Sequence, residues 1–202
     1  MRKQKKDKFI LGVTGSFSSG KSTVARLFSA KNTQVIDADK IAHSCLNSDR
    51  VIRQKVFAAF GPAVIGRGGV ILRKELGKIV FSDKVALKKL NRIIHPVLKR
   101  LIAGRINASS KKIIILDAAL IVEAGLKGWL DKLIVVKADP RQQVLRAKKK
   151  FSLSPVETLA RIKSQSSIRA KSRLADFIID NRGTLQQTKK QVAEIRRKLW
   201  KS

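Results

Sequence analysis

The sequence contains little of several residue types, and each shortage excludes a class of protein. Cys45 is the single cysteine among 202 residues, which excludes an internal disulfide framework and a cysteine-based zinc site and fits a reducing compartment, so we expect a cytoplasmic protein. Four prolines and 12 glycines are too few for a collagen-like or low-complexity chain. No apolar run approaches about 18 residues, and the run at 9–13 that follows the basic N-terminus breaks at Thr14, so we expect neither a membrane span nor an export signal.

Acidic residues are also scarce, because 14 Asp and Glu stand against 45 Lys and Arg and give a formal net charge of +31. Such a chain should associate with anions: nucleic acid, a membrane surface or phosphate-rich small molecules. Aromatic residues make up only 5% of the chain and tyrosine is absent, so bases of single strands would find few stacking platforms. We therefore expect at most weak, non-specific nucleic-acid binding. As a separate expectation, the protein is a monomer.

What is present is a globular composition with a repeating pattern. Hydrophobic residues are 44% of the chain, and a chain of this length buries about 70% of its unfolded surface. Continuously apolar, β-branched runs are typical of parallel strands covered on both faces. Helix-start signals at Asp139, Ser154 and Thr184 lie between or after them. The pattern predicts an α/β fold of three layers with an open parallel sheet of about five strands, at 9–13, 34–36, 113–116, 133–136 and 177–179.

Two segments do not fit a plain strand–helix alternation. The interval 40–111 has no convincing strand except a short candidate at 70–72, and it is too long for one crossover connection, so we predict a helical subdomain there. The segment 146–173 is also helical in pattern and carries nine Lys or Arg and one acid. The predicted core then comprises 8–39, 112–145 and 174–202, the last with a C-terminal helix.

One motif carries chemistry directly. The pattern G-x-x-x-x-G-K-[ST] follows a predicted strand and precedes a predicted helix, the context of a phosphate-binding loop, or P-loop. Its amide groups would wrap a polyphosphate, Lys21 would reach the β- and γ-phosphates of ATP, and Ser22 would bind Mg²⁺. The alternative is a glycine turn that binds nothing. The predicted nucleotide-binding residues are Gly15, Ser16, Phe17, Ser18, Ser19, Gly20, Lys21, Ser22 and Thr23.

Four carboxylates follow predicted strands, at the edge of the sheet where ligands of open α/β folds collect. Asp37 and Asp39 come after the second strand, and Asp117 ends the third, with Glu123 six residues later. Such acids can accept a hydroxyl proton or hold Mg²⁺ through water. Helix capping is the alternative role for each of them.

With these residues assembled, the chain resembles the dephospho-coenzyme A kinase family of P-loop kinases, from about Phe9 to Gly183. The resemblance rests on an ordered set of motifs, of which LNRIIHP is the most characteristic. After the P-loop they are VIDADKIAH at 35–43, FG at 60–61, GVILRKEL at 69–76, VF at 80–81, LNRIIHP at 90–96, LDAALIVEAG at 116–125, RQQVLRAKKK at 141–150 and ADFIIDNRG at 175–183.

The resemblance implies transfer of the ATP γ-phosphoryl group to the ribose 3′-hydroxyl of dephospho-coenzyme A, the last step of coenzyme A biosynthesis. It also implies a substrate-binding subdomain and a helical lid, to which 40–111 and 146–173 correspond. Asp39 matches the catalytic base, with Lys21 and Arg146 also catalytic. The substrate-binding residues it implies are Asp37, Asp39, His95 and Glu123, although His95 could equally be structural.

The chain departs from the family pattern at three places. Ser16 and Ser18 stand where the family usually has glycine, and Ala119 replaces a proline. Lys150 stands for a second lid arginine and lacks the planar fork that grips phosphate. Two other functions stay open on the sequence alone: another P-loop nucleoside or nucleotide kinase, and a basic nucleic-acid-binding P-loop protein.

Overall fold

The computed structural model describes residues 8–200 and divides them into two compact units. The larger unit contains the described residues up to Asp37 together with those from Arg105 onward, and the smaller unit is Ala38–Gly104.

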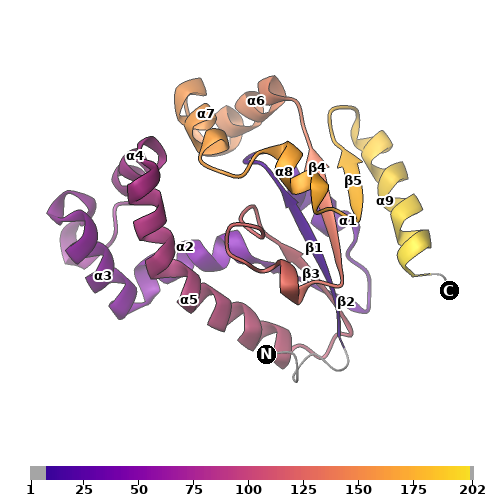
Figure 1. Ribbon diagram of the computed structural model, residues 1–202, viewed down its shortest axis with the longest axis horizontal. Coiled ribbons are helices and arrows are strands. Elements are labelled where there is room, and N and C mark those ends of the chain that lie inside the picture. Colours follow the sequence, from indigo (N-terminus) through magenta and orange to yellow (C-terminus); the bar gives the residue numbers. More distant parts are fainter. Residues whose placement is uncertain (1–7, 201–202) are drawn as a thin grey trace. The chain divides into compact units, whose positions relative to one another are not determined.

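The larger unit is built on one parallel sheet with the strand order β2-β3-β1-β4-β5 (Figure 1). All five predicted strands are confirmed, and each includes its predicted run. The central strand β1 is buried along almost its whole length, as a strand covered on both faces must be. The bounds are β1 Phe9–Gly15, β2 Thr33–Asp37, β3 Ile113–Asp117, β4 Lys132–Lys137 and β5 Phe177–Asp180.

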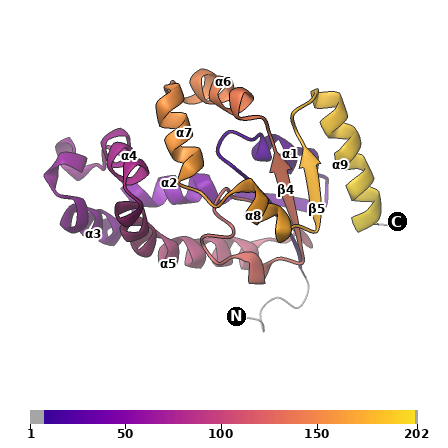
Figure 2. The same cartoon turned by 45° about the horizontal axis from the view of Figure 1, so that its top comes forward.

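Two helices, α1 (Lys21–Leu27) and α9 (Leu185–Leu199), cover one face of this sheet. Figure 2 shows α9 beside β5. Their apolar side chains pack on those of β1, β3, β4 and β5 in one cluster that includes Leu11, Phe28 and Val192. Burial of these side chains fixes β1 and α1 against each other, and thereby the two ends of the loop that connects them.

On the other face, Gly12 of β1 allows a close approach of two apolar side chains. A Cβ atom at Gly12 would lie 2.4 Å from Leu130 Cδ1 and 3.2 Å from Ile121 Cδ1. Leu130 follows a short 3₁₀ turn at Lys127–Trp129. A side chain at this position would therefore require the Leu130 side chain to shift, while the backbone angles of Gly12 place no demand for glycine.

The remaining helices of the larger unit are α6 (Pro140–Phe151), α7 (Pro155–Lys163) and α8 (Ile168–Arg173). The predicted helix starts are confirmed, because Asp139, Ser154 and Thr184 each cap the first turn of α6, α7 and α9. Ser154 and Thr184 each form a full capping box with the residue three positions on. These local signals fix where the chain turns after β4 and β5.

The smaller unit is helical, as its sequence predicts. It contains α2 (Ala38–Ser48), α3 (Arg50–Phe60), α4 (Arg73–Ser82) and most of α5 (Lys84–Ala108). Short 3₁₀ turns lie at Pro62–Val64 and Arg67–Gly69. The strand candidate at 70–72 is not a strand, because Ile71 forms only an isolated bridge with Ile65. Among residues 8–200 no helix is long and apolar enough to cross a membrane.

Candidate active site

The P-loop between β1 and α1 contains two residues in the left-handed region. Ser18 has φ 56° and Gly20 has φ 91°. A Cβ atom at Gly20 would lie 2.2 Å from Nδ2 of Asn181, so this position needs glycine for both its angle and its space. Ser18 adopts the same region with a side chain, which costs free energy that the surrounding contacts must offset.

The carbonyl groups of the loop are held by the protein. The Ser19 N–H donates to Ser16 O at 3.1 Å, and Gln143 Nε2 donates to Phe17 O. Ser19 O accepts from both Arg146 Nη1 at 3.2 Å and Asn181 Nδ2 at 2.8 Å. The Phe17 amide, which follows the Ser16 carbonyl, donates to Gln165 Oε1 at 2.9 Å. Since no described peptide bond is cis, the amides of Ser18 and Gly20 point away from the groups that hold the Phe17 and Ser19 carbonyls, and such N–H groups can bind anions.

Gln143 is a site residue that the sequence analysis missed. It is buried on α6, with 2% of its surface exposed, and besides Phe17 O it donates to Ser16 Oγ at 2.7 Å. The hydroxyl of Ser16, at a position where the family usually has glycine, is thus bonded inside the protein. A glutamine in the first turns of a basic helix gives no signal in a single sequence, because only packing shows that it points inward.

Lys21, Ser22 and Thr23 form the first turn of α1, directly after the loop. The first-turn N–H groups of a helix have no acceptor within the helix, and its N-terminus favours negative charge. The Thr23 amide turns back to Gly20 O at 3.0 Å. The structure therefore places the predicted lysine and hydroxyl groups where the loop meets the helix, as the motif requires.

Two carboxylates lie in register at the carboxyl ends of neighbouring strands. Asp37 of β2 pairs with Asp117 of β3, and Asp117 pairs with Val13 of β1, two residues before the loop begins. Asp117 is 2% exposed, whereas Asp37 is half-buried. The strand register therefore brings these two carboxylates to the same edge of the sheet, beside the P-loop.

Glu123, a predicted substrate residue, is bonded to the protein. Its Oε1 accepts from the Ser166 N–H at 2.8 Å and lies 3.2 Å from the ammonium of Lys171, which is completely buried. Lys171 Nζ also donates to Ala119 O at 2.6 Å. The turn after β3, where the family's proline is replaced by Ala119, is therefore fastened to α8. A contact of Glu123 with substrate stays a prediction.

Arg146, the predicted lid arginine, lies against the P-loop. Its guanidinium donates to Ser19 O, as described, and to Asn181 O at 3.2 Å and Gln142 Oε1 at 3.3 Å. The structure thus brings Arg146 to the P-loop. Its contact with the transferring phosphoryl group stays a prediction.

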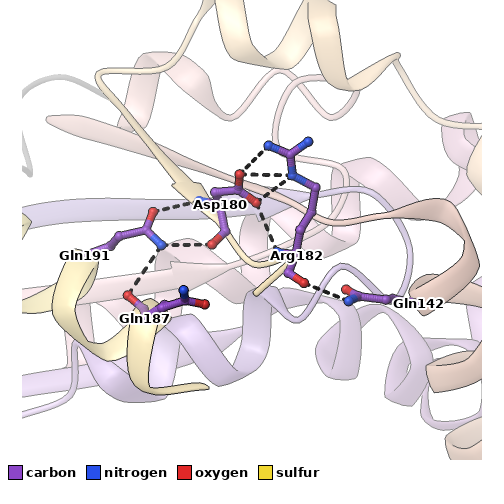
Figure 3. Close-up of polar contacts among 5 residues, drawn as sticks. All are labelled: Gln142, Asp180, Arg182, Gln187 and Gln191. Carbon is purple, nitrogen blue, oxygen red and sulfur yellow. Dashed lines mark hydrogen bonds and ion pairs between the residues drawn. The ribbon is translucent and has the colours of Figure 1, made fainter. Parts of the chain in front are cut away.

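A group of polar side chains fixes the connection from β5 to α9, which carries Asn181 (Figure 3). Gln191 accepts from the Asp180 N–H and donates to Asp180 O, both at 2.9 Å. Arg182 Nε donates to both carboxylate oxygens of Asp180, at 2.9 and 3.0 Å, while Gln142 donates to Arg182 O at 2.7 Å. The hydrogen bond from Arg182 lowers the pKa of Asp180 below its ordinary value, against the effect of burial.

This pKa shift predicts a pH-dependent contribution to stability. A carboxylate whose pKa is lowered in the folded state stabilises the fold at pH values above its ordinary pKa of 3.8. That contribution is lost as the pH falls through the pKa of the folded state. Because the Asp180 side chain is 41% exposed, we expect Asp180→Asn to lower Tm by only about 1–3 °C at pH 7. Thermal unfolding from pH 7 to pH 3 should show the difference shrinking at the acid end. Glu194→Gln, an exposed change on α9, controls for net charge, and an equal Tm shift in both variants would contradict the role of Asp180.

Asp39 and His95 belong to the smaller unit. Asp39 is in the first turn of α2 and is half-buried, and His95 is half-buried within α5, directly before Pro96. Their predicted roles as base and substrate residue stay predictions.

Comparison with known proteins decides the family. The family model for dephospho-CoA kinase matches residues 9–187. The chain belongs to the dephospho-CoA kinase family. Dephospho-CoA kinases of Bacillus licheniformis and Geobacillus kaustophilus are 38% and 36% identical to it, each over 92% of this chain and 94% of the relative.

Solved structures agree with this assignment. The dephospho-CoA kinase of Campylobacter jejuni superposes with a TM-score of 0.65 at 28% identity, over 95% of this chain and 97% of that one. The protein TT1252 of Thermus thermophilus reaches 0.77 at 30% identity, over 96% and 98%. Shikimate kinase of Bacteroides thetaiotaomicron, at 0.56 and 12% identity over 95% and 98%, shows the shared fold alone.

The predicted P-loop kinase fold and the family resemblance are both confirmed. As a dephospho-CoA kinase, the chain is an enzyme that phosphorylates dephospho-CoA with ATP in coenzyme A biosynthesis.

Proposed function

We propose a division of roles among the residues of this kinase, in which the P-loop and Lys21 hold ATP and Asp39 activates the acceptor. The observation that supports it is the P-loop itself, whose carbonyls at Ser16, Phe17 and Ser19 are held by the protein. The amides of Ser18 and Gly20 then face the opposite side, where they can bind the phosphates, whereas the amides of Phe17 and Ser19 donate to Gln165 and Ser16. An assay of ADP release that compares dephospho-CoA with AMP, adenosine and single-stranded DNA tests the acceptor, and turnover of AMP above dephospho-CoA would contradict the proposal.

In the reaction, the ribose 3′-oxygen forms a bond to the γ-phosphorus of ATP, the bond to the β-γ bridging oxygen breaks, and ADP leaves. Asp39 takes the proton of the 3′-hydroxyl, as a positioned carboxylate can. Lys21 and Arg146 place positive charge beside the phosphoryl oxygens. Asp37, His95 and Glu123 are proposed to contact the acceptor.

The residues present fit a bound Mg²⁺. Ser22 supplies a hydroxyl at the end of the P-loop, and the register pair Asp37 and Asp117 lies at the neighbouring strand ends. Within residues 8–200 there is no group of three or more His, Cys, Asp or Glu that could hold a metal, and Mg²⁺ commonly takes one or two protein ligands besides phosphates and waters. We propose that Ser22 binds Mg²⁺ directly and the carboxylates through water. Bound Mg²⁺ would neutralise charge on the phosphates.

The two helical parts are proposed to serve the acceptor and the transfer step. The predicted subdomain 40–111, which overlaps the unit Ala38–Gly104, would bind dephospho-CoA, and the segment 146–173 would act as the lid. We also propose a monomeric state, and a cytoplasmic location because the single cysteine fits a reducing compartment.

The charge of +31 leads to a separate prediction. We expect weak, sequence-independent binding of nucleic acid whose affinity falls steeply with salt, because neutralised phosphates release their counterions. Titration of labelled duplex and single-stranded DNA of two unrelated sequences, at several salt concentrations, measures it. Tight binding near physiological salt, or a preference for one sequence, would contradict it and favour a nucleic-acid function.

A further inference from the structure

One residue of the P-loop, Phe17, is contacted on several sides by the segment that follows β4. Its N–H donates to Gln165 Oε1 at 2.9 Å, and its carbonyl accepts from Gln143. Its ring lies 5.4 Å from that of Phe151 and 5.4 Å from the guanidinium carbon of Arg161. All four partners lie in α6, α7 or the connection from α7 to α8.

The two glutamines fix two consecutive peptide groups of the loop. The peptide between Ser16 and Phe17 is held at its carbonyl by the Ser19 N–H and at its own N–H by Gln165. The next peptide, between Phe17 and Ser18, is held at its carbonyl by Gln143. With both peptide planes fixed, the orientation of the peptide group before Ser18 is set, which supports the left-handed φ of that residue. The Ser18 amide then points to the side opposite Gln143.

The aromatic contacts extend this attachment across the segment. Lys150 Nζ lies 5.1 Å from the centre of the Phe151 ring, so two cations flank the pair of rings. A cation over an aromatic ring is attracted by its quadrupole. The ends of α6 and α7 are thus joined to the same loop residue that the glutamines hold.

The backbone next to Gln165 is also held by hydrogen bonds to the protein. The next residue, Ser166, donates its N–H to Glu123, and Glu123 pairs with the buried ammonium of Lys171 on α8. The backbone beside Gln165 is therefore fastened to the turn after β3. A side chain on an anchored backbone loses less entropy when it makes its hydrogen bond, so it can set the position of the peptide it contacts.

We propose that Gln165 is a positioning residue for ATP. Its side-chain oxygen, anchored through Glu123 and Lys171, holds the Ser16–Phe17 peptide so that the P-loop is already shaped for phosphates. The inference rests on the proposed function of the loop as the ATP site. The loss of Gln165 should weaken ATP binding while leaving the acceptor site unaffected.

The first test measures the affinity for each substrate separately. We expect Gln165→Leu, which keeps the volume but removes the acceptor, to raise the Kd of ATP about tenfold. The KM of dephospho-CoA should stay within about twofold. Gln186→Leu is the matched control, because Gln186 is exposed on α9, outside the segment 146–173, and it should behave like the unmodified enzyme. Should Gln165→Leu not fold, Gln165→Asn, which draws the oxygen back, serves in its place.

The second test follows the Phe17 amide itself by hydrogen exchange, in the protein without nucleotide. We expect about tenfold faster exchange in Gln165→Leu and retained protection in Gln165→Glu, which keeps an acceptor oxygen. The amide of Ile10, which donates to Asp131 at 2.6 Å, should exchange at the same rate in all variants.

Three results would overturn the proposal: unchanged exchange at Phe17, faster exchange with an unchanged Kd of ATP, or an equal loss of affinity for both substrates. An unchanged Kd of ATP in Lys21→Ala would instead contradict the proposed function of the loop as the ATP site. The Kd of ATP and the exchange at Phe17 can both be measured in that case, so the two failures are distinguishable.

Discussion

Lys21→Ala is expected to abolish phosphoryl transfer while the protein stays folded. Lys21 stands at the start of α1, next to a loop whose carbonyls are held by the protein, and the variant removes a charge that should contact the β- and γ-phosphates. The lysine is not part of the apolar cluster formed by the sheet with α1 and α9, so little core packing is lost. Turnover of dephospho-CoA and thermal unfolding should be measured on the same preparation.

The matched control for this variant is Lys31→Ala. Lys31 is exposed after α1, so the control removes the same charge from the same region without touching the loop, and we expect it to retain its activity. Substantial turnover in Lys21→Ala, with a Tm close to that of the unmodified enzyme, would remove Lys21 from its assigned role.

Asp39→Asn is expected to slow the chemical step about 10²- to 10⁴-fold, the usual contribution of a general base. Asparagine keeps the size and shape of the side chain but cannot take up the proton of the 3′-hydroxyl. Binding of ATP through the P-loop should be retained. Single-turnover rates and the Kd of ATP, measured together, separate the two effects.

The possible outcomes identify what Asp39 does. A loss in the chemical step alone indicates acid-base work, whereas a matching loss in Mg²⁺-ATP affinity indicates a metal role. Unaltered turnover would rule out Asp39 as the base, and it is what a mere helix cap predicts, since asparagine caps about as well as aspartate. Asp49→Asn is the matched control, because Asp49 caps α3 by accepting from the Ile52 N–H at 3.0 Å.

Local signals in the sequence were sufficient for much of the fold. The strands are continuous apolar runs because both of their faces are covered, and their order along the chain with the helix caps at Asp139, Ser154 and Thr184 predicts the α/β alternation. The P-loop could be read directly, because its chemistry depends on backbone amides, two glycines and one lysine at fixed spacing. For Asp37 and Asp117 the sequence predicted only that both lie at the same edge of the sheet, and the structure showed that they are in register.

The residues that hold the P-loop could not be found in this way. Gln143, Gln165 and Asn181 lie between 126 and 162 positions from the loop atoms they contact. Nothing in their local sequence distinguishes a glutamine that turns inward from one that faces solvent. The same holds for Lys171. In the sequence it is one basic residue among many in a basic segment, and only the structure shows its ammonium fully buried against Glu123 and Ala119 O.

The sequence by itself determined the family, the strands, the helix starts and the nucleotide-binding motif, because each depends on residue types at short, fixed spacing. The tertiary structure decided how the loop is held in shape. That depends on hydrogen bonds between groups far apart in the chain, and a buried polar group finds its partner only when the packing of α6, α8 and the β5–α9 connection brings the two together.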